Sequence, residues 1–368
     1  MRVVIVADQL FASRERELLS RLEIGLADEG VRVIQALPAE GGLQASASGQ
    51  MSGLCAPVVT FASTGLPFTT GYRARKLADK LDEIDSGTEE SPVDIVHVFG
   101  GSLWNFGIAL AESCGAAVAL EIWRAGLIER ASVPIASVKD VMMVAPDPGI
   151  ERALRQRGLP TRLASWGVHA AETLAPKLEA GRATTVMLIG GGNDQRAMRA
   201  ALEGLGACIR KHPDTLVFAD ALAARRAGLY ELAMKLGMLA NLSLIEEMES
   251  RRDLLVQGDV LILCEGHGEQ RTIMLDAMSH AMVVLSVEDR FCEVLREGVT
   301  ARLIKGPSAG SWAEAIGAVL QDPAGARRLG ESARAFIAEH RRASDHVKAV
   351  LEAYSWLRRD RAVAPMVP

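Results

Sequence analysis

The sequence predicts an α/β protein of two domains, each built on a parallel β-sheet. The chain has 368 residues, which suffices for about two domains with sizeable cores. Short apolar runs of strand length alternate with longer segments of helical periodicity in both halves, the pattern of a parallel sheet covered by helices. Glycines follow predicted strands at 100–101, 190–192 and 266–268, which is where ligands approach the sheet in open α/β folds.

Composition narrows the class of protein. With 49% hydrophobic and 24% charged residues, the chain is expected to be globular rather than disordered. The net charge of -5 argues against a general nucleic-acid binder. Five scattered cysteines without a Cys-x-x-Cys pair indicate reduced thiols in the cytoplasm and no zinc site. The apolar run at 3–7 is too short for a signal-peptide core, and no run approaches the ~20 residues of a transmembrane helix.

In the first half, apolar and β-branched runs are expected to be strands at 3–7, 31–37, 58–61, 94–99, 117–122 and 141–145. Helices are expected at 13–29, 72–84, 103–113 and 148–157, with loops at 9–13 and 40–52 and a turn at 89–92. His97 lies in an apolar strand, so we expect a hydrogen-bonded core histidine rather than a catalytic one. No Gly-x-Gly-x-x-Gly follows the first strand, which disfavours a dinucleotide-binding fold.

In the second half, strands are expected at 184–189, 216–219, 242–245, 260–263 and 283–285. Helices are expected from about 196 to 210 and at 222–236, 251–256, 271–281, 311–320, 323–341 and 344–359. Strand, glycine-rich turn, helix and strand thus follow one another from 259 to 286, which is a βαβ unit.

The turn of this βαβ unit predicts an anion-binding site. Free backbone N–H groups at the start of a helix, next to Gly266 and Gly268, attract anions, and Arg271 adds a charge suited to phosphate. Asp276 follows Glu269 by seven positions, about two helical turns, and lies on roughly the same face. Hydrogen-bond donors that bind phosphate, followed by carboxylates that bind hydroxyls, suit a sugar nucleotide. The alternative is an ordinary βαβ crossover with an acid-rich, solvated turn.

The same stretch resembles the donor-site segment of retaining glycosyltransferases of family 4, which have the GT-B fold. That segment reads Asp-Val-x-x-x-Pro-Ser, then Glu-Gly-x-Gly, then Glu-Ala-Met-Ala-x-Gly-x-Pro-Val-Val. The matching residues here are Asp259-Val260, Asp276-Ala277-Met278 and Val283-Val284. The resemblance implies that Asp276 binds the ribose hydroxyls and that a glutamate contacts the sugar. Glu269 stands one place after the family's glutamate and Glu265 three places before it, so both remain candidates.

Gly190, Gly191 and Gly192, followed by Arg196, resemble the family's Gly-Arg-x-x-x-x-Lys loop, whose two cations hold the donor diphosphate. Arg196 takes the place of the lysine, whereas Gly191 replaces the arginine, so one cation is missing unless Arg271 substitutes for it. The alternative is a plain tight turn before a helix. In the family, the backbone after the strand at 242–245 borders the nucleobase, which makes Glu246 a candidate.

The first half carries a weaker resemblance. Its strand at 94–99 is similar to the family's Asp-Val-Val-His-x-His strand, and Gly100 and Gly101 then suit the approach of a ligand. The loop at 9–13 lacks the glycine pair of the family, and the strand at 117–122 ends without its histidine. The segment at 162–169 resembles the strand that leads into the interdomain linker.

These matches predict an acceptor-side domain at 1–167, a nucleotide-sugar domain at 168–343 and, at 344–368, a helix that returns to the first domain. Arg358, Arg359 and Arg361 in that helix offer a second interpretation, contact with an anionic membrane surface; we favour the return to the first domain.

The resemblance as a whole implies two Rossmann-like domains that face a central cleft. It implies a hexosyltransferase-like enzyme that moves a sugar, with retention, from a UDP- or GDP-sugar to an acceptor hydroxyl without a bound metal or other cofactor. The N–H groups near Gln270, Arg271 and Thr272, with Arg196, are expected to stabilise the departing diphosphate, while Glu269 positions the sugar.

Two alternatives stay open: a non-catalytic GT-B protein that binds a nucleotide sugar or a partner, and a sugar-nucleotide epimerase. A metallohydrolase is disfavoured because the seven histidines form no His-Glu-x-x-His motif.

Overall fold

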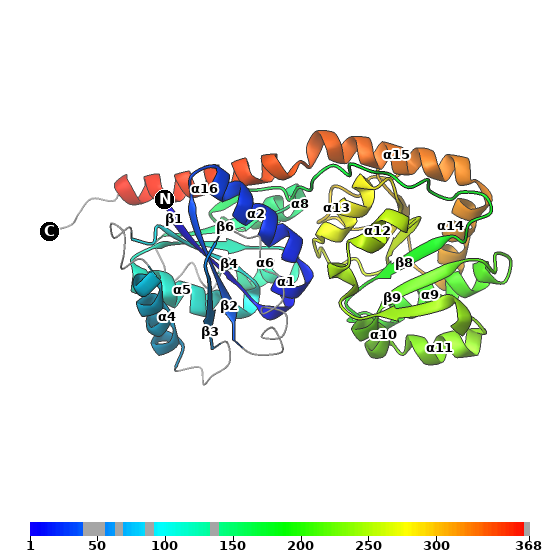
Figure 1. The fold of residues 1–368 in the computed structure, drawn as a ribbon, viewed down its shortest axis with the longest axis horizontal. Helices are drawn as coiled ribbons and strands as arrows, with labels where there is room; N and C mark the ends of the chain where they lie inside the picture. The colour runs from blue at the N-terminus through cyan, green and yellow to red at the C-terminus, as the bar shows by residue number, and fades with distance from the viewer. Residues whose placement is uncertain (40–55, 63–68, 85–91, 133–139, 364–368) are drawn as a thin grey trace. The chain divides into compact units, whose positions relative to one another are not determined.

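The computed structural model describes residues 1–39, 56–62, 69–84, 92–132 and 140–363. The loop expected at 40–52 and most of the turn expected at 89–92 lie outside these residues. The chain forms two compact units (Figure 1). One comprises Met1–Trp166 together with Ala343–Pro368, and the other comprises Gly167–Arg342.

The first unit is built on a seven-stranded, fully parallel sheet. Its strands lie in the order β3 (Val58–Phe61), β2 (Arg32–Pro38), β1 (Arg2–Ala7), β4 (Ile95–Phe99), β5 (Ala117–Glu121), β6 (Val141–Ala145) and β7 (Thr161–Leu163). Its helices are α1 (Gln9–Arg14), α2 (Arg16–Asp28), α4 (Thr70–Ile84), η2 (Gly101–Leu103), α5 (Trp104–Cys114), α6 (Gly126–Arg130), α8 (Pro148–Arg155) and α16 (Ala343–Val363). The strand order reverses between β1 and β4, so the carboxyl edge of these two strands is the place where such a sheet binds ligands.

The prediction of a loop at 9–13 is wrong, because α1 occupies this segment. Asp8 caps the helix: its Oδ1 accepts a hydrogen bond from the N–H of Phe11 at 2.9 Å. Phe11 is fully buried beside Phe99, with 5.1 Å between the ring centroids. The cap and this buried aromatic contact explain why a short helix forms here.

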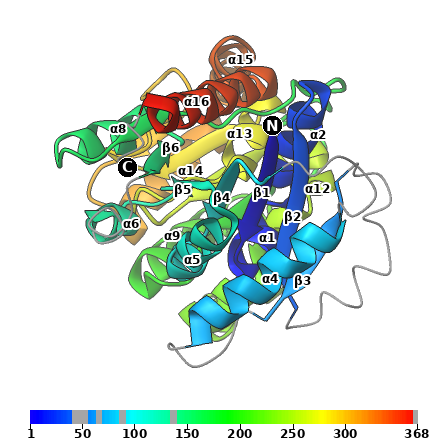
Figure 2. The ribbon, with the colours of Figure 1, turned by 90° about the vertical axis from the view of Figure 1, so that its left-hand side faces the viewer.

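The C-terminal helix α16 packs against α2 and against β5, β6 and β7 of the first unit (Figure 2). Its Tyr354 is fully buried, and the hydroxyl lies 2.8 Å from Nδ1 of His97. Nε2 of His97 lies 3.1 Å from Glu121, whose other oxygen accepts the indole N–H of Trp166 at 2.7 Å. His97 is therefore a hydrogen-bonded core histidine, as predicted, and this network connects α16 to the sheet.

The second unit is built on a six-stranded, fully parallel sheet. Its strands lie in the order β10 (Leu242–Ile245), β9 (Leu216–Asp220), β8 (Thr185–Ile189), β11 (Val260–Leu263), β12 (Val283–Val287) and β13 (Arg302–Ile304). Its helices are α9 (Gln195–Ile209), α10 (Ala221–Ala227), α11 (Leu229–Leu236), η3 (Leu239–Asn241), η4 (Met248–Ser250), α12 (Asp253–Gln257), α13 (Thr272–Ser279), α14 (Ala309–Gln321) and α15 (Pro323–His340).

One helix expected in this unit, at 222–236, is in fact two. Gly228 separates α10 from α11 because its backbone is left-handed, with φ of 63°. That conformation costs a glycine little and ends the first helix.

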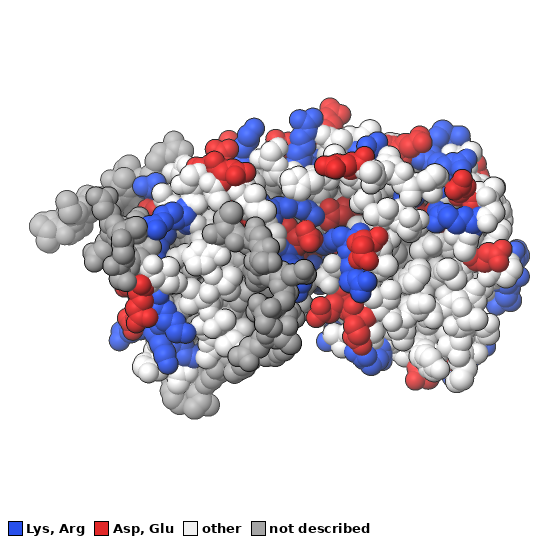
Figure 3. Space-filling model, viewed as in Figure 1, with Lys and Arg blue, Asp and Glu red and all other residues white. Residues whose placement is uncertain are grey.

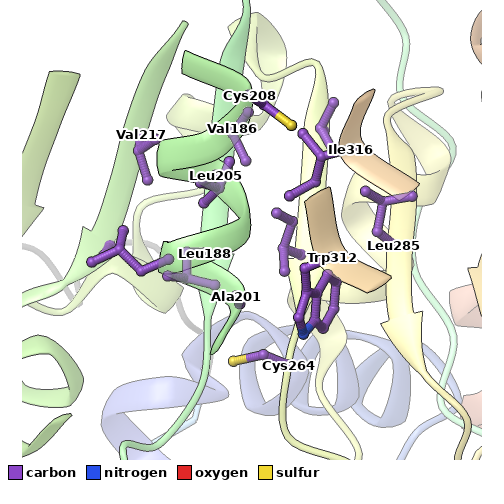
Figure 4. Close-up of a cluster of buried hydrophobic side chains, with 14 of the residues drawn as sticks. Val186, Leu188, Ala201, Leu205, Cys208, Val217, Cys264, Leu285, Trp312 and Ile316 are labelled. Carbon is purple, nitrogen blue, oxygen red and sulfur yellow. The ribbon is translucent and has the colours of Figure 1, made fainter. Parts of the chain in front are cut away.

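The core of the second unit includes the packing of α9 against α14. Figure 4 shows this cluster, with Leu205 and Cys208 on α9 and Trp312 and Ile316 on α14. All four side chains are buried, and the Sγ of Cys208 donates to the carbonyl of Ala313 at 3.3 Å. The two helices anchor the sheet whose carboxyl edge carries the candidate site.

Acidic and basic side chains lie intermingled on the face drawn in Figure 3. This mixture agrees with the small net charge of -5. Within the described residues, no helix is both long and apolar enough to span a bilayer.

Candidate functional site

The strand order of the second unit locates its ligand-binding edge. From β8, the chain continues to β9 and β10 on one side of the sheet and returns through β11 to β12 and β13 on the other. In doubly wound sheets, ligands bind at the carboxyl ends of the strands that flank this reversal, here β8 and β11. The glycine loop that follows β8 and the acidic loop that follows β11 both begin at this edge. They are the two motifs from which the sequence predicted a binding site.

The glycine loop consists of Gly190, Gly191 and Gly192 and leads into α9. Gly192 has φ of 71°, and a Cβ built on it would lie 2.8 Å from the carbonyl oxygen of Ala223, so only glycine fits. Asp194 then caps α9, since its Oδ1 accepts the N–H of Ala197 at 2.9 Å. The loop is thus a tight turn held against α10.

Glu265, the first residue after β11 and Cys264, reaches across to this loop. Its Oε2 accepts the N–H of Gly191 at 2.5 Å, and its Oε1 accepts the N–H of Asp194 at 2.8 Å. Glu265 therefore occupies two backbone donors of the glycine loop, which resembles a loop that holds the donor diphosphate. Glu265 thus contacts the glycine loop, whereas Glu269, the other candidate for the sugar contact, pairs with Arg271.

Glu269 belongs to a buried ion-pair cluster around Arg271. The guanidinium contacts Glu269 through Nη2 at 2.5 Å and Glu249 through Nη1, and it is only 6% exposed. Burial alone would lower the pKa of Arg271, but the two carboxylates raise it above its ordinary value. This double pairing weighs against the alternative in which Arg271 substitutes for the missing diphosphate cation. It supports a different role, in which Arg271 holds Glu269 in place.

A different arginine lies beside the glycine loop. Nη1 of Arg226, on α10, donates to the carbonyl of Gly191 at 3.0 Å, and its side chain is exposed. Arg196 is also exposed, on the first turn of α9, and has no ion-pair partner within the described parts of the chain. We missed Arg226 in the sequence because nothing in its local pattern connects α10 to the loop after β8.

The start of α13 is the second set of backbone donors at this edge. Its N-cap residue, Arg271, makes no side-chain capping hydrogen bond, in contrast to Asp194 at the start of α9. Gln270 is buried and donates through Nε2 to the carbonyl of Phe291 at 3.0 Å, which fixes the backbone before the helix. Gly268, with φ of 63°, donates its N–H to Asp289 at 2.6 Å. The side chains of Gln270 and Asp289 therefore hold the turn in place before α13 begins.

Two predicted site residues on α13 are buried and share one partner. The Oγ1 of Thr272 accepts a hydrogen bond from Nη2 of Arg252 at 2.8 Å. The carboxylate of Asp276 lies 3.5 Å from Nε of the same arginine and is 11% exposed. Asp276 has a fixed orientation, and a ribose hydroxyl would meet only the small part of it that remains exposed.

The remaining candidates follow other strands, β10 in the second unit and β4 in the first. Glu246 follows β10, is exposed and pairs with Arg225 at 2.9 Å. Gly100 and Gly101 belong to the first unit, at the carboxyl end of β4. There Asp8 accepts the hydroxyl of Ser102 at 2.8 Å, a polar pair that the sequence pattern did not single out. Among the described residues, no group of three or more His, Cys, Asp and Glu side chains could hold a metal ion.

Comparisons with known proteins bear on the fold. No protein-family model matches the sequence, and no curated protein matches it. Among solved structures, the chain is similar to a glycosyltransferase from Rickettsia africae, at 13% identity and a TM-score of 0.72, covering 98% of this chain and 99% of that one. It is also similar to Alr3699/HepE from Anabaena in complex with UDP-glucose, at 12% identity and a TM-score of 0.75, covering 97% and 100%.

Sucrose-phosphate synthase from Thermosynechococcus elongatus is a third similar structure, at 14% identity and a TM-score of 0.70, covering 98% of this chain and 100% of that one. At these identities the likeness shows the fold alone. The fold is GT-B, with two Rossmann-like units, as the sequence predicted.

Proposed function

We propose that this protein is a glycosyltransferase that transfers a sugar, with retention, from a nucleotide-diphosphate sugar to an acceptor hydroxyl. The observation that carries the proposal is the convergence of the glycine loop, two exposed arginines and the N-terminus of α13 at the edge of β8 and β11. Similar structures with UDP and UDP-glucose support a UDP-sugar as the first donor to test.

The residues receive the following roles in this proposal. The backbone N–H groups that begin α13 and the guanidinium of Arg196 stabilise the charge that develops on the departing diphosphate. Glu269, held by Arg271, positions the sugar, while Asp276 contacts the ribose.

The remaining roles lie at the ends of other strands. Arg226 adds a second cation at the glycine loop, where the sequence resemblance lacks one. Glu246 borders the nucleobase after β10, and Gly100 and Gly101 lie on the acceptor side in the first unit.

The first experiment measures donor binding and turnover. Calorimetric titration with UDP, GDP and their sugars is expected to show binding of one nucleotide series. A separate assay of slow donor hydrolysis is then expected to show release of that nucleotide from its sugar. The anomeric configuration of the released sugar, read by NMR, then tests retention. Conversion of the donor to another sugar nucleotide without an acceptor would indicate an epimerase instead.

Arg196→Ala tests the diphosphate role. Removing one charge that stabilises a transition state typically lowers turnover by about 10²-fold. Because Arg196 is exposed, the free energy of unfolding should change by less than about 0.5 kcal/mol. Arg210→Ala, an exposed arginine at the other end of α9, is the matched control and should leave turnover unchanged. A parallel loss of stability and turnover in Arg196→Ala would remove this role.

The second candidate function is a non-catalytic GT-B protein that binds a nucleotide sugar or a partner. Two observations favour it: Glu265 occupies donors of the glycine loop, and two carboxylates neutralise Arg271. If the wild-type protein binds a nucleotide sugar but does not turn it over, this function is favoured over the transferase.

A further inference from the structure

Glu265 occupies the glycine loop in the manner of an anionic ligand. Two backbone N–H groups from successive parts of the loop converge on one carboxylate, at 2.5 and 2.8 Å. Hydrogen bonds from backbone N–H groups to a carboxylate are charge-assisted and roughly twice as strong as neutral ones. A phosphate group bound to this loop would need the same donors, so the carboxylate and the phosphate exclude each other.

The charges around the loop strengthen this exclusion. Asp194 contributes a second carboxylate at the start of α9, so a phosphate would enter beside two negative groups while Glu265 stays in place. Arg196 and Arg226 are the exposed cations that favour the phosphate. Displacing Glu265 therefore removes a competitor and an electrostatic repulsion together.

The backbone leaves one way for Glu265 to move. A Cβ built on Gly266 would lie 2.6 Å from Cγ2 of Val287, so the chain after Glu265 passes close against β12. Before Glu265, Cys264 is buried at the end of β11. With the backbone packed on both sides, the carboxylate leaves the loop by rotation of its own side chain.

We propose that Glu265 is a specificity-determining residue that competes with a diphosphate for the N–H groups of Gly191 and Asp194, so that the glycine loop accepts the diphosphate only when this side chain has rotated away. The inference rests on the proposed function for its natural ligand. Its test uses inorganic pyrophosphate, which needs no acceptor and no sugar.

The experiment titrates the full chain with pyrophosphate and follows the amides of Gly191 and Asp194 by ¹⁵N NMR. Glu265→Gln keeps the length of the side chain but replaces the carboxylate by a weaker acceptor, so pyrophosphate should bind at these amides at least about tenfold more tightly than in the wild type. Glu265→Asp keeps the charge but shortens the side chain, which should give an intermediate affinity. Glu314→Gln, an exposed glutamate on α14, should bind as the wild type does.

Equal affinities in the wild type and Glu265→Gln, or no shift of either amide in any protein, would overturn the inference. Weaker binding in Glu265→Gln would also overturn it, because Glu265 would then shape the loop for its ligand instead of competing. If Glu265→Gln does not fold, Glu265→Asp decides by the same comparison. If Glu265→Gln binds pyrophosphate more tightly but the wild type turns over no sugar nucleotide, the competition between Glu265 and phosphate is supported and only the proposed glycosyl transfer is contradicted.

Discussion

At the scale of single residues, Lys177 shows how the second unit holds a charge in its interior. The side chain is only 5% exposed, and Nζ donates to the carbonyls of Leu255 and Val256 at 3.2 and 2.8 Å. These carbonyls belong to the last turn of α12, where a cation is favourable. Burial nevertheless lowers the pKa of Lys177 to about 8; Asp259 opposes this shift and Arg182 adds to it.

This shift predicts how stability depends on pH. In the unfolded chain the lysine keeps its proton up to its ordinary pKa of 10.5, whereas in the folded protein it releases the proton from about pH 8. The unfolded state therefore binds more protons between these values, and raising the pH through this window favours the folded state. The free energy of unfolding of the wild type, minus that of Lys177→Met, should rise from about pH 8 to about pH 10.5. Parallel curves for the two proteins would contradict the prediction.

The residues of the candidate site were only partly predictable. The glycines, Glu265, Glu269, Arg271 and Asp276 belong to local motifs that are visible in the sequence. Glu269 and Arg271 are neighbours in the sequence, but other partners are not local: Glu265 lies 74 positions from Gly191, and Arg226 lies 35 positions from it. No periodicity or turn signal encodes such a pairing, so the sequence alone could not show that Arg271 meets two carboxylates or that Glu265 occupies the loop.

At the scale of secondary-structure elements, burial explains which strands were predictable. The strand β11 is buried at every position, so its sequence is an unbroken apolar run. The strand β13 has only three residues, one of them the exposed Arg302, and it carries no such signal. The helix α1 was not predicted because it has only six residues, too few for a clear helical periodicity, and it depends on the cap by Asp8 and on the burial of Phe11.

The contact of α9 with α14 gives a prediction at this scale. A Cβ built on Gly204 of α9 would lie 2.5 Å from Cβ of Trp312 and 2.9 Å from the backbone N of Ala313. Because neither atom is the end of a flexible side chain, Gly204→Ala should force the helices apart and lower the free energy of unfolding by about 1–3 kcal/mol. Urea denaturation of the two proteins measures the difference.

Gly317→Ala, on α14 itself, is the matched control. Its added Cβ would meet only ordinary contacts, 3.9 Å or more from Cys208 and Gln321. Alanine has a higher helix propensity than glycine, so this variant should be more stable than the wild type by up to about 1 kcal/mol. If both alanines had the same effect, the packing of α9 on α14 would not be the reason that Gly204 is small.

At the scale of the whole molecule, the first unit is assembled from two distant parts of the chain. Residues Met1–Trp166 and Ala343–Pro368 form it together, and the second unit is continuous between them. The helix α16 contributes buried side chains at Val350, Ala353, Tyr354 and Leu357. Without this helix, β5, β6 and β7 would lose apolar cover, and His97 would lose its hydrogen bond to Tyr354.

Deletion of residues 343–368 should therefore unfold the first unit and spare the second, because the second unit has its own sheet and core. Hydrogen exchange followed by mass spectrometry should show fast exchange in β4, β5 and β6, with protection retained in β8 and β11. Tyr354→Phe removes only the hydroxyl, so it should cost about 1 kcal/mol and keep both units protected. Retained protection of β4 to β6 in the deletion variant would mean that the first 166 residues form a stable domain without their C-terminal helix.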